Sequence, residues 1–236
     1  MNILAVDTSG PVAGVAVLRH GALAYEGLAV NKMTHSVNMM PMVEEALNRS
    51  GLAIEDIDLY AAVVGPGSFT GVRIGVSAVK GMAHGVGKPC IAVDALEALA
   101  AGLFGVDGVL CPIQDARAGQ VYGAAFRAGM PPERLLPDMA EKLPDYLAKV
   151  FAVAKADDKL VFVGDGVATY RQAIVEAIGD RAVFPPAHCS CLRPSSVAML
   201  ADVRQDTAVD YLTLMPLYLR APQAERARAA KEAAKA

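Results

Sequence analysis

The stretch GPGSFTGVRIG, residues 65–75, decides the fold class of this chain. It follows an apolar run at 59–64 that is typical of a buried strand, and it leads into a stretch with apolar residues at helical spacing. The glycines, proline and hydroxyl residues therefore indicate a strand–turn–helix junction. Because free N–H groups at the start of a helix attract anions, this junction predicts either a phosphate-binding turn or a tight packing corner.

Common phosphate and nucleophile motifs do not match this junction. A dinucleotide-binding fingerprint would need glycine at the position of Thr70, and the P-loop ending is absent because Pro89 follows Gly87-Lys88. The Gly-x-Ser-x-Gly spacing of an esterase is not met around Ser68. These generic motifs leave the function open.

The composition is that of a folded α/β protein with a substantial core. The chain has 236 residues, of which 54% are apolar, and its net charge is −3. Such a charge gives no broad basic field, so any RNA would be held mainly by another subunit. No apolar run is long enough for a membrane helix, and a start that carries Asp7 is unlike a signal peptide, so we expect a cytoplasmic protein with no membrane association.

Four cysteines are too few and too scattered for a disulfide framework. His188, Cys189 and Cys191 cluster, but no second pair stands at zinc-site spacing. We therefore expect a surface loop with reduced thiols there, with a structural metal as the alternative.

The chain repeats one plan in two halves. Each half has a strand meander followed by a strand, a glycine turn and a helix, which predicts two α/β lobes across a cleft. The predicted strands are 3–6, 12–18, 22–29, 59–64, 90–93, 109–114, 121–126 and 160–163, and the main helices are 36–48, the stretch after GPGSFTG, and 170–178. We predict an N-terminal lobe at 1–105, a C-terminal lobe at 106–222 and a disordered alanine-rich tail at 223–236.

The Pro-rich stretches GMPPERLLP (129–137) and FPPAHCSCLRP (184–194) are predicted to be loops. The basic residues of the tail suggest a solvated, frayed helix, with an arm that touches RNA as the alternative.

Five segments together resemble the bacterial TsaB family along nearly the full chain. They are NILAVDTSG (2–10), THS (34–36), GPGSFTGVRIG, DARAGQVY (115–122) and PLYLR (216–220). The resemblance implies the two-lobed actin/hexokinase-like (ASKHA) fold. It also implies a non-catalytic scaffold that is required, with the related protein TsaD, to form the threonylcarbamoyl group on the tRNA adenosine next to the anticodon, in tRNAs that read codons beginning with adenine.

The resemblance also implies partners. TsaD would dock on the N-terminal lobe helices, TsaE would join the complex, and the chain would self-associate without TsaD. The chain itself would need no cofactor, ATP would bind at the complex interface, and tRNA would be held mainly through the complex. The expected interface residues are Val37, Met40, Leu47, Val72, Val76 and Val79.

One segment departs from the family pattern. Ala118 and Gln120 stand where family members often have charged residues, which puts any ionic contact there in doubt. Arg117 is either a surface ion-pair residue or a contact to a partner or RNA.

The alternative function is a small ATP-dependent phosphotransferase of the same superfamily that uses the interlobe cleft. Six residues could contact a nucleotide in this cleft, although their types are equally common in ordinary turns at strand ends. They are Asp7, Thr8, Ser9, Asp115, Gly164 and Gly166. A peptidase is a third reading, against which the lack of metal-ligand spacing argues.

The sequence predicts neither catalytic residues nor a metal site. TsaD binds its metal through a spaced pair of histidines, whereas none of the histidines here lies at i, i+4 from another. His35, next to Ser36, is expected at a helix N-terminus.

Overall fold

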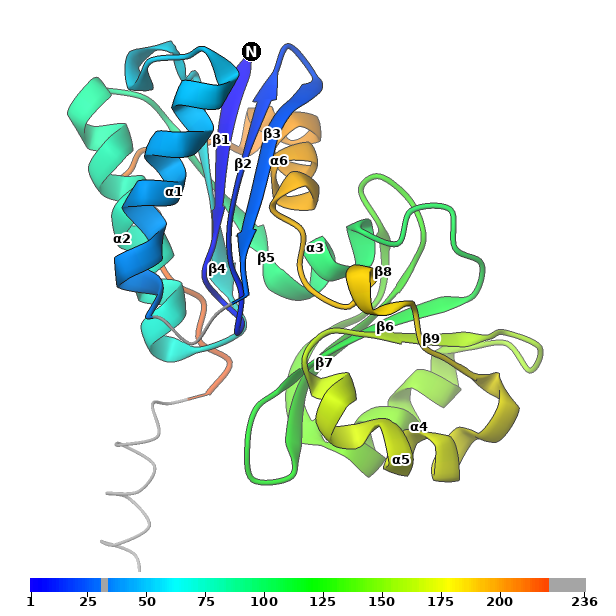
Figure 1. Cartoon of the computed structure of the whole chain (residues 1–236). Helices are drawn as coiled ribbons and strands as arrows, with labels where there is room; N and C mark the ends of the chain where they lie inside the picture. The colour runs from blue at the N-terminus through cyan, green and yellow to red at the C-terminus, as the bar shows by residue number, and fades with distance from the viewer. Residues whose placement is uncertain (31–33, 221–236) are drawn as a thin grey trace, which may run out of the picture.

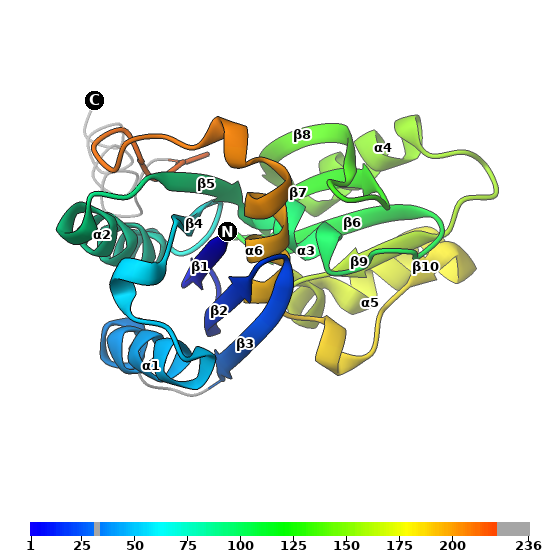
Figure 2. The same ribbon diagram turned by 90° about the horizontal axis from the view of Figure 1, so that it is seen from above.

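Two five-stranded β-sheets, each with its own helices, lie side by side in the computed structural model, which describes residues 1–30 and 34–220 (Figures 1 and 2). The first half comprises β1 (Asn2–Asp7), β2 (Ala13–Arg19), β3 (Ala22–Ala29), α1 (His35–Ser50), β4 (Leu59–Gly65), α2 (Phe69–Val86), β5 (Cys90–Asp94) and α3 (Ala95–Ala101). The second comprises β6 (Val109–Asp115), β7 (Gln120–Arg127), β8 (Glu133–Lys142), α4 (Leu143–Val153), β9 (Leu160–Val163), α5 (Gly166–Ile178), β10 (Ala182–Val183) and α6 (Pro194–Val203).

The two sheets have the same topology. Their strand orders are β3-β2-β1-β4-β5 and β8-β7-β6-β9-β10. In each, the first three strands form an antiparallel meander, and the fourth pairs in parallel with the first. The α/β fold class and the duplication of one plan of strand meander and helices in two lobes are confirmed.

The predicted strand–turn–helix junction is also present. Strand β4 is fully buried, and the Ser68 hydroxyl caps α2 by accepting a hydrogen bond from the N–H of Gly71 at 3.2 Å. Gly87, with a φ of 65°, ends the helix in the left-handed conformation. The apolar face of α2, which includes Val72, Val76 and Val79, packs on the first sheet.

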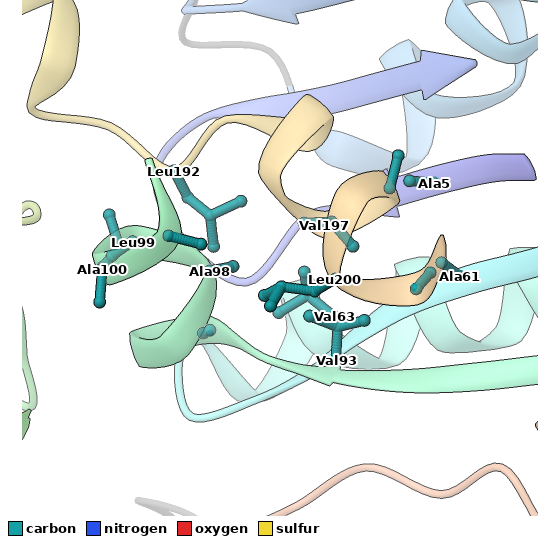
Figure 3. Packing of buried hydrophobic residues seen from close by; sticks show 14 of the residues in the cluster. Ala5, Ala61, Val63, Val93, Ala98, Leu99, Ala100, Leu192, Val197 and Leu200 are labelled. Carbon is teal, nitrogen blue, oxygen red and sulfur yellow. The ribbon is translucent and has the colours of Figure 1, made fainter. Parts of the chain in front are cut away.

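One apolar cluster joins the two lobes. It includes Ala5 and Val63 of the first sheet, Phe126 of the second, and the helices α3 and α6. Leu99 of α3 and Leu200 of α6 lie in this cluster (Figure 3). The lobes are therefore held together by a shared core, in addition to any contact across the cleft.

Several elements, among them β8, α4, β10 and α6, differ from the sequence prediction. The stretch predicted as a Pro-rich loop from residue 129 contains the start of β8, and α4, β10 and α6 were not predicted. Helix α6 packs on β1 and β2, so the assignment of all of 106–222 to the second lobe does not hold for this helix. The predicted tail, 223–236, lies outside the described residues. Within those that are described, no helix has the length and apolar character needed to span a bilayer.

Candidate functional site in the interlobe cleft

The main cleft lies between the lobes and has a volume of about 670 Å³. Residues from four segments line it: 9–11 after β1, 66–70 at the start of α2, 114–117 at the end of β6, and 217–220 near the described C-terminal end. His35, Tyr122 and Asp165 complete the wall. The cleft thus brings together all the family-like segments, although they are distant in sequence.

The GPGSFTG turn is a packing corner. The N–H of Ser68 donates to the carbonyl of Ser9 at 2.7 Å, and the Thr8 hydroxyl donates to the carbonyl of Gly71 at 2.7 Å. A Cβ at Gly71 would lie 2.1 Å from the Thr8 carbonyl oxygen, so only glycine fits. The corner also leaves the N–H groups of Phe69 and Thr70 without a partner in the described part of the chain.

The second lobe builds a matching turn. The Asp7 carboxylate accepts a hydrogen bond from the Ser9 N–H at 2.8 Å, and the Asp115 carboxylate accepts one from the Arg117 N–H, also at 2.8 Å. Gly164 has a φ of 105°, and a Cβ there would lie 2.2 Å from the Ile113 carbonyl oxygen. The duplicated sequence plan therefore produces duplicated turn geometry.

The PLYLR segment closes one side of the cleft. The Leu217 N–H donates to the Val64 carbonyl at 2.7 Å, and the Arg220 guanidinium donates to the Ala116 carbonyl at 2.8 Å. The rings of Phe69 and Tyr218 lie 4.8 Å apart. This segment therefore connects the first lobe to the turn of the second.

The residues predicted for a nucleotide cleft separate into three groups. Ser9 and Asp115 line the main cleft. Asp7 and Gly164 line a separate cavity of about 40 Å³. The remaining two are packing residues: Thr8 is buried beneath α2, and a Cβ at Gly166 would lie 3.1 Å from the Gln114 backbone.

The buried carboxyls have perturbed acidity. Desolvation raises the pKa of Asp7 from 3.8 to about 6, against the opposing effects of the hydrogen bond from the Ser9 N–H, the nearby Ser9 hydroxyl and His35. Burial also raises the pKa of Asp165, and the nearby Asp115 adds to the rise. Both effects disfavour the charged carboxylate.

Two buried polar atoms that belong to lining residues lack partners. Ser9 is 1% exposed and Gln114 is 4% exposed, yet the hydroxyl oxygen of Ser9 and the side-chain oxygen of Gln114 make no hydrogen bond. Leaving such groups unpaired costs about 1–3 kcal/mol each. Sequence reasoning missed Gln114, Asp165 and Arg220 as cleft residues, although Asp165 lies between the predicted Gly164 and Gly166 and Arg220 lies in the family-like PLYLR segment.

Comparisons with known proteins agree with these segments. A family model described as "TsaD: tRNA N6-adenosine threonylcarbamoyltransferase" matches residues 29–228. The tRNA threonylcarbamoyladenosine biosynthesis protein TsaB of Bacillus subtilis is 37% identical over 227 residues, which is 95% of this chain and 96% of the relative. The chain belongs to the TsaB family.

A second named relative and a solved structure are also similar to this chain. TsaB of Escherichia coli is 40% identical over 131 residues, which cover 54% of this chain and 55% of the relative. A crystal structure from Pseudomonas aeruginosa, described as an uncharacterized protein with similarity to peptidase YEAZ, superposes with a TM-score of 0.78 at 27% identity. That match covers 93% of this chain and 99% of the other.

The expected TsaD-docking residues divide between surface and core. Val37 is 52% exposed and Met40 is 49% exposed on α1. The other four are buried and cannot form an accessible docking face, because they pack against the first sheet: Leu47, Val72, Val76 and Val79. That part of the prediction is wrong.

The His–Cys cluster lies in and beside a short 3-10 turn at Ala187–Cys189. Cys189 and Cys191 are free thiols of intermediate exposure. Over residues 1–30 and 34–220, no three His, Cys, Asp or Glu side chains gather at a spacing that could hold a metal ion.

Proposed function

We propose that this chain is the non-catalytic scaffold subunit that TsaD requires to form the threonylcarbamoyl group on tRNA adenosine. The single observation that carries the proposal is the near-full-length 37% identity to a protein named for threonylcarbamoyladenosine biosynthesis. The match of a TsaD family model to most of the chain supports a shared ancestry with the proposed partner. Two related subunits with the same fold can pair through equivalent helices.

The docking surface that we propose is the outer face of α1 and α2, formed by Val37, Met40, Ser77, Gly81 and Gly85. All five residues are exposed, and the two helices lie next to each other on the outer side of the first sheet (Figure 1). We call this surface the α1–α2 face. Its apolar and small side chains suit close packing of a partner helix.

Packing within the chain does not explain why glycine occupies positions 81 and 85 of this face. Gly81 and Gly85 lie within α2, where each glycine costs about 0.5–1 kcal/mol relative to alanine. A Cβ at either position would meet no atom within 4 Å, so packing within the chain does not require glycine. Close approach of a partner helix would account for both residues.

The same proposal includes the remaining expectations that the family resemblance implies for partners, ligand and location. They are self-association through the α1–α2 face when TsaD is absent, entry of TsaE into the complex, ATP at the complex interface, contact with tRNA mainly through the complex, and a cytoplasmic location. The phosphotransferase alternative gains no support, because Asp7 is buried and lines the small cavity instead of the main cleft.

Incorporation of labelled threonine into unmodified tRNA tests the function. Reactions would contain ATP, bicarbonate, TsaD and the other pathway proteins, with or without this chain. Omission should abolish transfer. Met40→Glu and Gly81→Gln should weaken TsaD binding at least tenfold and lower transfer in parallel, because each places a long polar side chain on the α1–α2 face.

The matched control is Val175→Glu on α5, since Val175 is 44% exposed but lies on the second lobe. It should bind TsaD and support transfer like the unmodified chain. Undiminished transfer without this chain would contradict the scaffold role. Normal TsaD binding by Met40→Glu and Gly81→Gln would contradict only the docking surface.

A further inference from the structure

A cluster of charged side chains joins the two lobes outside the interlobe cleft. The first lobe contributes Asp94, the last residue of β5, and Glu97 of α3. The second lobe contributes Arg134 and Asp138 of β8, and Arg204 follows α6. We call these five residues the junction cluster. None of them lines the main cleft.

One arginine of the junction cluster holds carboxyls from opposite lobes. The Arg134 guanidinium lies 3.5 Å from the Asp94 carboxyl and forms a hydrogen-bonded ion pair with Asp138. The same guanidinium lies 4.6 Å from the centre of the Phe126 ring, which is buried. Both carboxyls are largely buried as well. Arg134 must therefore balance two carboxyls in a position where water screens little of their charge.

The other arginine of the cluster is already matched. Arg204 donates to both oxygens of Glu97, one of them at 2.7 Å. The ion pairs among the described residues bring no further cation to the cluster. Three carboxyls thus face two guanidinium groups, so the charges balance only when one carboxyl carries a proton.

The proton belongs to the pair of aspartates. Burial raises the pKa of Asp94 well above its usual range, and the adjacent Asp138 raises it further, whereas the Glu97 N–H and Arg134 lower it. A protonated carboxyl can donate a hydrogen bond to its neighbour, but two adjacent carboxylates repel each other. The contact between β5 and β8 is therefore favourable only while the proton is bound.

We propose that Asp94 and Asp138 share one proton and form a proton-dependent latch between the lobes, and that loss of this proton loosens the contact of β8 with β5 and α3. The folded chain binds the proton more tightly than the unfolded chain, so the latch is closed at low pH and weakens as pH rises. The apolar cluster around α3 and α6 keeps the lobes joined when the latch opens. The proposal goes beyond the scaffold role and does not depend on it.

Carbon-13 NMR of the full chain, labelled at its aspartate carboxyls and followed from about pH 4 to about pH 9, tests the shared proton. The Asp94 signal should titrate well above the usual value of 3.8. Asp138→Asn should move this titration to lower pH, because the second carboxyl is gone. An Asp94 signal that titrates near 3.8 in the unmodified chain, or that Asp138→Asn leaves unchanged, would overturn the proposal.

Hydrogen exchange followed by mass spectrometry tests the loosening. After correction for the intrinsic effect of pH, peptides of β8 and α3 should exchange at least about tenfold faster once Asp94 has lost its proton, because each unit of raised pKa changes the opening equilibrium about tenfold. Asp94→Asn and Asp138→Asn should remove this acceleration, since an amide can donate to the remaining carboxyl and no repulsion arises.

A purely structural ion pair would give a different result, because both variants would then exchange faster at every pH. That result, or exchange of β8 that ignores pH in the unmodified chain, would contradict the latch. The matched control is Asp158→Asn, which removes a carboxyl that pairs with Arg127 at 2.8 Å within the second lobe. This variant should keep the acceleration, and its loss there would place the effect outside the junction cluster and overturn the proposal.

Discussion

At the scale of single residues, Asp7 should give the chain a distinctive pH dependence. Its side chain is buried at the end of β1, and its pKa is raised from 3.8 to about 6 by desolvation. Asp165 adds to the rise, while Ser9 and His35 oppose it. Between these pH values the native state holds a proton that the unfolded state has released, so stability should fall as pH rises from about 4 to about 6.

The variant Asp7→Asn tests this effect. Asparagine keeps an oxygen that can accept the Ser9 N–H, but it carries no charge to desolvate. The variant should match the unmodified chain near pH 4 and exceed its unfolding free energy by up to about 3 kcal/mol near pH 7. Urea denaturation at the two pH values gives the comparison. A stability difference that does not change with pH would contradict the assignment.

The sequence predicted some residues of the cleft correctly, but it assigned several buried residues of α1 and α2 to the docking surface. The resemblance and the turn chemistry of Ser9 and Asp115 led to the cleft, because both residues lie at the C-terminal end of the first strand of a lobe. Helical spacing also selected Val72 and Val76 for docking, but the structure buries them. Apolar spacing cannot distinguish the face of a helix that packs on its own sheet from a face that packs on a partner.

At the scale of elements, helix α2 contains glycines with opposite roles. Gly71→Ala should destabilise the chain by about 1–3 kcal/mol, because the new Cβ would lie 2.1 Å from the Thr8 carbonyl oxygen. Gly81→Ala should stabilise it by about 0.5–1 kcal/mol, because open space surrounds that position and alanine favours the helix. Thermal unfolding of the two variants provides the test. If both variants changed the stability of the chain equally, the backbone around Thr8 would be able to move and accommodate the new Cβ at position 71.

The elements that were missed have a physical explanation. Strand β8 follows two consecutive prolines, Pro131 and Pro132, and contains a third, Pro137; proline cannot donate to a sheet ladder, so the segment was predicted to be a loop. It forms because β8 is an edge strand that pairs only with β7. Helix α6 starts with Pro194, the last residue of the Pro-rich stretch 184–194, and its packing against the first sheet is a long-range contact that local patterns do not encode.

At the scale of the whole molecule, the shared core should make the two lobes one cooperative unit. Leu200 is 1% exposed in the cluster that joins both sheets through α3 and α6, whereas Leu147 is 4% exposed in a cluster of the second lobe alone. Figure 3 shows Leu200 near Val63 and Val93 of the first sheet. Loss of packing in either cluster should therefore affect both lobes.

The variants Leu200→Ala and Leu147→Ala test this cooperativity. Each should lower the free energy of unfolding by about 2–5 kcal/mol, since each leaves a cavity in a close-packed core. Hydrogen exchange followed by mass spectrometry should show faster global exchange in peptides from both β1 and β6 in each variant. If Leu147→Ala accelerated exchange in β6 but left β1 unchanged, the lobes would unfold separately, and the apolar layer of α3 and α6 would be a hinge between two domains.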